Sequence, residues 1–122
     1  MNIKEIMELH NFVVLGNTVT PDRYAAMIKN GLAEHGYTVA GVGKELASIN
    51  EVPFDIDVID LCINPKEGLR LLQENTKPFK QIVIQPGASD EKLLDWLNGQ
   101  KIPYIDGCLL TGLSIYGGTK VN

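Results

Sequence analysis

The sequence predicts an α/β protein, a Rossmann-like three-layer sandwich with a mostly parallel, five-stranded sheet. Short apolar runs, which suit strands, alternate along the chain with stretches of helical periodicity. The first run, from Phe12 to Leu15, is unbroken rather than alternating, as expected for a strand that helices cover on both faces. Strands that alternate with helices at this spacing form βαβ units, and such units build parallel sheets.

Length and composition limit the remaining possibilities. The chain has 122 residues, of which 44% are hydrophobic and 21% charged, so we expect one folded domain over residues 1–122. A net charge of -4 argues against general nucleic-acid binding, which needs a basic surface. The apolar runs are too short to cross a membrane and the N-terminus lacks the features of a secretory signal, so we expect a cytoplasmic protein without membrane association. Two cysteines are too few for a disulfide scaffold or a structural zinc site.

The segment after the first strand organises the rest of the chain. Gly16 follows the strand and lets the backbone turn. Thr20 is a good N-cap and Pro21 suits the first helical position, so we predict a helix that begins there and ends before Gly36. The free N–H groups of its first turn, together with the charge of Arg23, form a site that favours an anion such as phosphate.

The other elements are predicted from the same signals. Further strands are expected at residues 37–42, 57–63, 81–85 and 102–105. Further helical segments are expected at residues 3–7, as a single turn within 46–54, and at 64–75, 89–99 and 108–113. Asn64 followed by Pro65 is a strong helix start, and Ser89 is expected to cap the next helix. Pro103 lies in the last strand, which argues for an edge position.

The predicted topology brings several loops together. In a doubly wound sheet, ligands bind beyond the carboxyl ends of the strands, where the strand order reverses. The turns that reach this edge are residues 16–23, Gly43-Lys44, residues 63–65 and residues 85–87. These four turns form the candidate site.

The turn sequences argue against a nicotinamide dinucleotide. Gly16 is the one glycine of the first loop, followed by Asn17 and Thr18, whereas the dinucleotide fingerprint needs three glycines. At the end of the second strand, where an acid would bind the ribose of NAD, the chain has Lys44. A lysine there suits a phosphorylated ribose, which NADP and coenzyme A (CoA) both carry. The missing glycine pattern favours CoA, and Lys44 predicts a preference for CoA over dephospho-CoA.

A series of short motifs strengthens this interpretation. The series is Val13 to Thr18, Pro21 to Tyr24, Glu34 to Val39, Val42 to Lys44, Gln85 to Gly87 and Cys108-Leu109. It resembles the small stand-alone CoA-binding domain family, which is similar to the amino-terminal domain of the succinyl-CoA synthetase alpha subunit. The resemblance covers nearly the whole chain, and it implies that the loop after the first strand and the end of the second strand hold the nucleotide part of CoA.

The chain also departs from the family pattern. Many members have a serine where this chain has Ala25, and Asn-Pro where it has Val42-Gly43. Many have an arginine before the proline where this chain has Ile63-Asn64. The candidate cofactor-binding residues are Gly16, Asn17, Thr18, Arg23, Tyr24, Val42, Gly43, Lys44, Ile63, Asn64, Pro65, Gln85, Pro86 and Gly87.

The motifs predict binding rather than catalysis. The sequence shows no nucleophile and base at a recognisable spacing, no metal-ligand cluster and no second domain for group transfer, so we expect non-catalytic binding of CoA or an acyl-CoA. Two alternatives stay open: an NADP-binding enzyme or sensor, and an interaction protein whose nucleotide site has decayed, as the missing serine at Ala25 suggests. A protein partner or a homo-oligomer is left open. Lys44 could instead form an exposed ion pair with Glu45.

Predictions for Gly16 and for the two cysteines complete the analysis of the sequence. A side chain at Gly16 would obstruct the turn or the phosphate, so Gly16→Val is predicted to abolish binding in a domain that stays folded. Cys62 is expected to be a core residue. Cys108 near a CoA site could form a mixed disulfide, but Asp106 would raise its thiol pKa and no cation lies in residues 107–114, which predicts an unreactive thiol.

Overall fold

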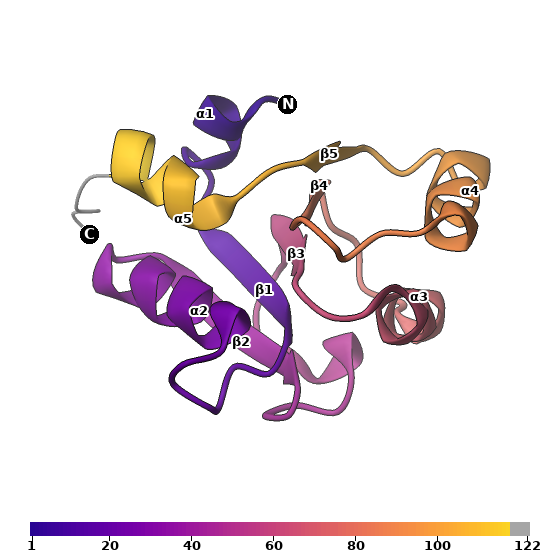
Figure 1. The fold of residues 1–122 in the computed structure, drawn as a ribbon, viewed down its shortest axis with the longest axis horizontal. Helices are drawn as coiled ribbons and strands as arrows, with labels where there is room; N and C mark the ends of the chain where they lie inside the picture. The colour runs from indigo at the N-terminus through magenta and orange to yellow at the C-terminus, as the bar shows by residue number, and fades with distance from the viewer. Residues whose placement is uncertain (118–122) are drawn as a thin grey trace.

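The computed structural model describes residues 1–117 and contains one five-stranded sheet in the order β2-β1-β3-β4-β5 (Figure 1). The strands are β1 (Asn11–Gly16), β2 (Thr38–Gly43), β3 (Val58–Leu61), β4 (Gln81–Ile84) and β5 (Tyr104–Asp106). The helices are α1 (Ile3–Ile6), α2 (Tyr24–Glu34), α3 (Pro65–Glu74), α4 (Glu91–Gly99) and α5 (Leu109–Gly112), with a 3₁₀ turn at Ile49–Glu51 and a π-helical turn at Leu113–Gly117. Every neighbouring pair of strands is parallel, which confirms the predicted α/β fold class.

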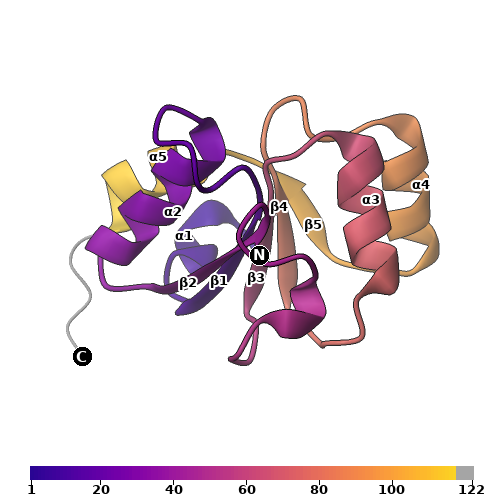
Figure 2. The ribbon, with the colours of Figure 1, turned by 90° about the horizontal axis from the view of Figure 1, so that it is seen from below.

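Helices cover both faces of the sheet (Figures 1 and 2). Helices α1, α2 and α5 pack on one face and α3 and α4 on the other, so the molecule has three layers with an apolar core on each side of the sheet. Strand β1 supplies both cores, because Val13 and Leu15 face α3 and α4 while Phe12 and Val14 face α2. Because both faces of β1 are buried, every residue from Phe12 to Leu15 is apolar, and apolar and polar residues do not alternate along the strand.

Helix α2 begins three residues later than the sequence predicts. The predicted N-cap, Thr20, does not cap it, because its hydroxyl accepts a hydrogen bond from Asn17 Nδ2 at 3.0 Å. The carboxamide oxygen of Asn17 accepts from the backbone N–H groups of Val19 and Thr20, both at 3.1 Å, so Asn17 closes a local turn within the loop. Arg23 occupies the N-cap position without a side-chain cap, and α2 starts at Tyr24.

The other predicted boundaries are close to the observed ones. Asn64 Oδ1 accepts from the Glu67 N–H at 3.0 Å and Pro65 is the first residue of α3, as predicted. Helix α4 is capped by Asp90, whose Oδ1 accepts from the Leu93 N–H at 2.8 Å, and not by Ser89. Strand β5 lies at the predicted sheet edge and begins at Tyr104. Within residues 1–117, no helix has the length and apolar content needed to cross a bilayer.

The strand order places the functional edge of the sheet. Strand β1 pairs with β2 on one side and β3 on the other, so the chain winds outward in opposite directions from the gap between β1 and β3. The segments that follow β1, β3 and β4 meet at the same end of the sheet (Figure 2). This is the switch point at which doubly wound sheets bind their ligands.

Candidate functional site

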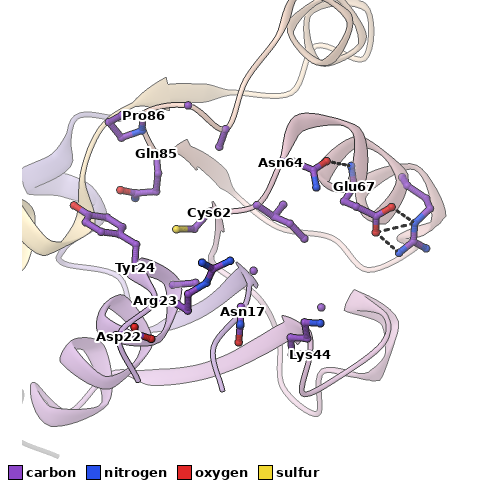
Figure 3. Close-up of a pocket in the computed structure, with 17 residues that line it drawn as sticks. Asn17, Asp22, Arg23, Tyr24, Lys44, Cys62, Asn64, Glu67, Gln85 and Pro86 are labelled. Atoms are coloured by element: carbon purple, nitrogen blue, oxygen red, sulfur yellow. Dashed lines mark hydrogen bonds and ion pairs between the residues drawn. The ribbon is translucent and has the colours of Figure 1, made fainter. Parts of the chain in front are cut away.

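A cleft of about 1030 Å³ opens at the switch point (Figure 3). It is lined by loop and helix-start residues from both sides of the sheet: Gly16, Asn17, Asp22, Arg23, Tyr24, Ala25, Gly43, Lys44, Cys62, Ile63, Asn64, Glu67, Arg70, Gln85, Pro86, Gly87 and Ala88. The four predicted turns therefore contribute to one cleft. A volume of this size is at the upper end of the range for small-molecule and cofactor sites.

Three of the predicted site residues do not line the cleft. Thr18 is buried, and its hydroxyl donates to Glu45 Oε2 at 2.6 Å, away from the ligand space. Val42 is fully buried in the core beneath α3 and α4. Pro65 starts α3, one residue beyond Asn64, which does line the cleft. The predicted turns reach one cleft, but the directions of individual side chains within them were not predictable from the turn positions.

Sequence reasoning also missed several lining residues, which are Asp22, Ala25, Cys62, Glu67, Arg70 and Ala88. Most are neighbours of predicted positions. Glu67 and Arg70 follow the N-cap residue Asn64 by three and six positions. They therefore lie on the same face of α3 as Asn64, which lines the cleft. The 3.6-residue period of a helix that starts at Pro65 would have identified this pair.

Two cations of the cleft are uncompensated. Within residues 1–117, neither Arg23 nor Lys44 makes an ion pair or a side-chain hydrogen bond. Glu45 does not pair with Lys44, because its carboxylate accepts from Lys29 Nζ at 2.7 Å. The alternative interpretation of Lys44 as half of an exposed pair with Glu45 is therefore wrong. The side chains of Arg23 and Lys44 are available for an anionic ligand.

A third cation on the rim is already paired. Arg70 contacts Glu67 at 2.9 Å and Glu74 at 3.4 Å, one turn apart on α3. Its side chain is 54% exposed, so these pairs are solvent-screened and weak. Hydrogen bonding and the attraction of Arg70 lower the pKa of the Glu67 carboxyl. Among the lining residues, Glu67 and Arg70 of α3 balance each other, whereas Arg23 and Lys44 outnumber Asp22 on the β1 and β2 loops, which leaves that side with a net charge of +1.

Gly16 is required by the packing of the sheet. Its φ is +154°, and a Cβ atom there would lie 2.4 Å from the carbonyl oxygen of Cys62 and 2.8 Å from Cβ of Ala25. A larger residue would push β1 away from the end of β3. The prediction that Gly16→Val leaves the domain folded is therefore corrected, and loss of binding in that variant would not locate the site.

A buried polar pair lies next to the cleft, which is lined by Gln85 but not by its partner Asp60. Asp60 is 0% exposed in the middle of β3, and its Oδ1 accepts from Gln85 Nε2 at 2.5 Å. Burial raises the pKa of the Asp60 carboxyl to about 8, although the hydrogen bond from Gln85 opposes the shift, so the carboxyl is mostly protonated at neutral pH. Asp60 Oδ2 and Gln85 Oε1 are buried without a partner among residues 1–117.

A cysteine and a tyrosine from distant parts of the chain meet beside this pair. The Tyr24 hydroxyl lies 2.7 Å from Cys108 Sγ. This hydrogen bond, followed by burial, raises the pKa of Tyr24 to about 12. Burial raises the pKa of the Cys108 thiol, but hydrogen bonds from Tyr24 and from Thr111 and Leu110 outweigh burial and lower it. The expectation that this pKa is raised was therefore wrong.

These groups form a continuous polar patch on the α2 side of the sheet. We call Tyr24, Asp60, Cys62, Gln85 and Cys108 the thiol cluster, because it contains both cysteines of the chain. Figure 3 shows Gln85 and Cys62 extending toward the ring of Tyr24 at the end of the cleft away from Lys44. Among residues 1–117, no three metal-ligating side chains are grouped as a metal site requires.

The chain is similar to several solved structures. A conserved hypothetical protein from Pyrococcus furiosus is 28% identical, with a TM-score of 0.75 over 84% of this chain and 98% of that one. The PH1109 protein redesigned for binding is 21% identical, with a TM-score of 0.83 over 98% of this chain and 93% of that one. The protein ID.343 from Thermus thermophilus is also 21% identical, with a TM-score of 0.76 over 93% and 98% of the two chains. No curated protein matches the chain.

A protein-family model matches the part of the chain that forms the sheet and the cleft. The model of the CoA binding domain matches residues 10–114, which include every strand and every residue that lines the cleft. The chain therefore belongs to the CoA-binding domain family.

Proposed function

We propose that this protein binds CoA or an acyl-CoA in the cleft and does not turn it over. The observation that supports this most strongly is the pair of uncompensated cations, Arg23 and Lys44, at the cleft end formed by the β1 and β2 loops. CoA carries a ribose phosphate and a pyrophosphate at one end, and these groups need cations or backbone N–H donors. Membership of the family supports the same ligand class.

The residues present fit a CoA molecule laid along the cleft. Figure 3 places Arg23 between Tyr24 and Lys44; both cations would contact the phosphates, and Gly16 and Asn17 also line the cleft. The other end of the cleft offers Tyr24, Cys62 and Gln85, which are less polar and carry no fixed charge at neutral pH. A ligand with phosphates at one end and an uncharged arm at the other matches this gradient.

Binding without turnover is the simplest role for this arrangement. Asp60 does not line the cleft, its side chain is fully buried, and one of its oxygens accepts a hydrogen bond from Gln85. A general base must be within hydrogen-bond reach of the proton that it removes. Asp22 and Glu67 line the rim, where solvent screens them. A carrier or sensor of CoA needs none of these groups to act as an acid or base.

Isothermal titration calorimetry with CoA, dephospho-CoA, NADP and NAD tests this function. We expect CoA to bind best, and Lys44→Ala to weaken CoA about tenfold while leaving dephospho-CoA nearly unchanged. Arg23→Ala should weaken both ligands. Lys4→Ala is the matched control, because Lys4 is an exposed lysine on α1 that does not line the cleft. Tighter binding of NADP than CoA, or binding of none of the four ligands, would overturn the proposal.

A further inference from the structure

The position of Cys108 connects it to the cleft. It follows β5 at the carboxyl edge of the sheet, and its sulfur lies 2.7 Å from the hydroxyl of Tyr24. Tyr24 itself lines the cleft and is 43% exposed. Cys108 is partly exposed as well. Cys108 does not itself line the cleft, so a group bound at the Tyr24 end of the cleft would reach its sulfur past the hydroxyl of Tyr24.

The surroundings of Cys108 favour a thiolate. The Tyr24 hydroxyl and donors from Leu110 and Thr111 direct hydrogen bonds at the sulfur, and together they lower its pKa despite partial burial. The pKa of Tyr24, about 12, keeps the phenol protonated and able to donate at neutral pH. A larger thiolate fraction at neutral pH makes a cysteine a better nucleophile toward disulfides.

Cys62 provides an internal comparison. It lines the cleft directly after the end of β3 and packs against the apolar core on the α2 side, and burial, followed by the nearby Asp60 and Cys108, raises its pKa to about 12. Its thiol therefore stays protonated at neutral pH. The two cysteines of the thiol cluster differ in ionisation, and of the two, Cys108 is the competent nucleophile.

The buried pair beside the sulfurs indicates that a ligand group belongs there. Gln85 is 2% exposed and lines the cleft, yet its Oε1 has no partner among residues 1–117, and neither has Asp60 Oδ2. Leaving a buried polar atom without a partner is unfavourable, so such atoms are usually satisfied by a ligand or by water. The arm of CoA carries amide N–H donors shortly before its thiol. An amide N–H donating to Gln85 would bring the thiol end of the arm to Cys108.

We propose that Cys108 is a covalent attachment site, at which its sulfur exchanges with the disulfide of CoA and holds one CoA as a mixed disulfide. The Cys108 thiolate attacks one sulfur of CoA disulfide, the S–S bond of the ligand breaks as the new S–S bond forms, and the second CoA leaves as a thiolate that takes a proton from water. Cys108 is oxidised and the departing CoA is reduced, so no other oxidant is needed. This inference rests on the proposed function, because the cleft must first bind the nucleotide part of the ligand.

The test is to incubate the native protein with CoA disulfide and to follow its intact mass. We expect one added CoA, removable by a reductant, in the native protein and in Cys62→Ser, and none in Cys108→Ser. Tyr24→Phe should react roughly tenfold more slowly at neutral pH, with its pH–rate profile displaced to higher pH, because one donor to the sulfur is lost. Addition at Cys62, or an unchanged pH–rate profile in Tyr24→Phe, would overturn the proposal.

A second disulfide distinguishes directed capture from general thiol reactivity. Oxidised glutathione lacks the nucleotide, so we expect it to react more slowly than CoA disulfide, and Arg23→Ala should slow the reaction of CoA disulfide alone. Equal rates for the two disulfides would show a reactive surface thiol and contradict capture by the cleft. If calorimetry detects CoA binding while no adduct forms, covalent attachment fails and the proposed binding function stands. If calorimetry detects no CoA binding, the proposed function itself fails.

Discussion

At the scale of the residue, Asp60 is the most unusual position in the chain. It lies at the centre of a parallel sheet, paired in register with Val14 on β1 and Val83 on β4. A carboxylate with no cation beside it is costly in such a place, and the structure accommodates it by raising its pKa. The protonated acid can donate a hydrogen bond, which a carboxylate cannot.

This shift predicts how stability depends on pH. The pKa of Asp60 is raised from 3.8 to about 8 by burial, so between these values the folded state holds a proton that the unfolded state has lost. The free energy of unfolding should therefore fall as pH rises from about 4 to about 8. Asp60→Asn removes this titration and should show a flatter profile in urea unfolding followed by circular dichroism. A parallel decline in both proteins would contradict the assigned pKa of Asp60.

Residue-level contacts also show where sequence reasoning reaches its limit. The loops of the cleft could be predicted, because parallel strands end at one edge and Gly16, Asn64 and Gly87 mark their turns. The bond between Tyr24 and Cys108 joins residues 84 positions apart, and the three-dimensional path of the chain alone brings them together. Reasoning from the neighbours of Cys108 selected Asp106 as the main influence on its pKa, whereas burial raises that pKa and hydrogen bonds from Tyr24, Thr111 and Leu110 together lower it further than burial raises it.

At the scale of the element, helix starts were predicted well where the cap had no competitor. Asn64 caps α3 as predicted. Thr20 and Pro21 carried an equally strong signal for α2, but Asn17 satisfies Thr20 and the backbone after it. A competing side chain three residues earlier, here Asn17, can therefore engage a predicted cap residue such as Thr20 so that it does not cap the helix. Strand prediction succeeded because burial on both faces leaves continuous apolar runs.

The two predicted caps should respond differently to truncation. Asn64→Ala removes the acceptor of the Glu67 N–H and should cost about 1 kcal/mol in the free energy of unfolding. Thr20→Ala removes only a hydrogen bond within an exposed turn, so it should cost less than about 0.5 kcal/mol. Chemical denaturation of both variants measures the difference. A larger loss for Thr20→Ala would mean that Thr20 holds the start of α2 after all.

At the scale of the whole molecule, the cleft and the sheet depend on the same strand ends. The carboxyl ends of β1 and β3 must lie close together for the switch point to form, and the cleft opens directly above them. Lys44 lies at one end and Tyr24, Cys62 and Gln85 at the other, with Arg23 between them (Figure 3), so an extended ligand would cross the gap between the two halves of the sheet. The glycines in these turns therefore serve the architecture as well as the site.

Two glycines of the cleft separate these roles. Gly16 has no room for a Cβ atom, whereas a Cβ atom at Gly87 would meet nothing within 4 Å, although both have positive φ, +154° and +87°. Gly87→Ala should therefore cost only the conformational penalty, about 1 to 2 kcal/mol. Gly16→Ala adds the clash with the Cys62 carbonyl and should cost clearly more, at least about 3 kcal/mol. Thermal unfolding of the two variants tests this order. Equal midpoints would mean that the strand ends can separate, and that the close contact of β1 with β3 is not what Gly16 protects.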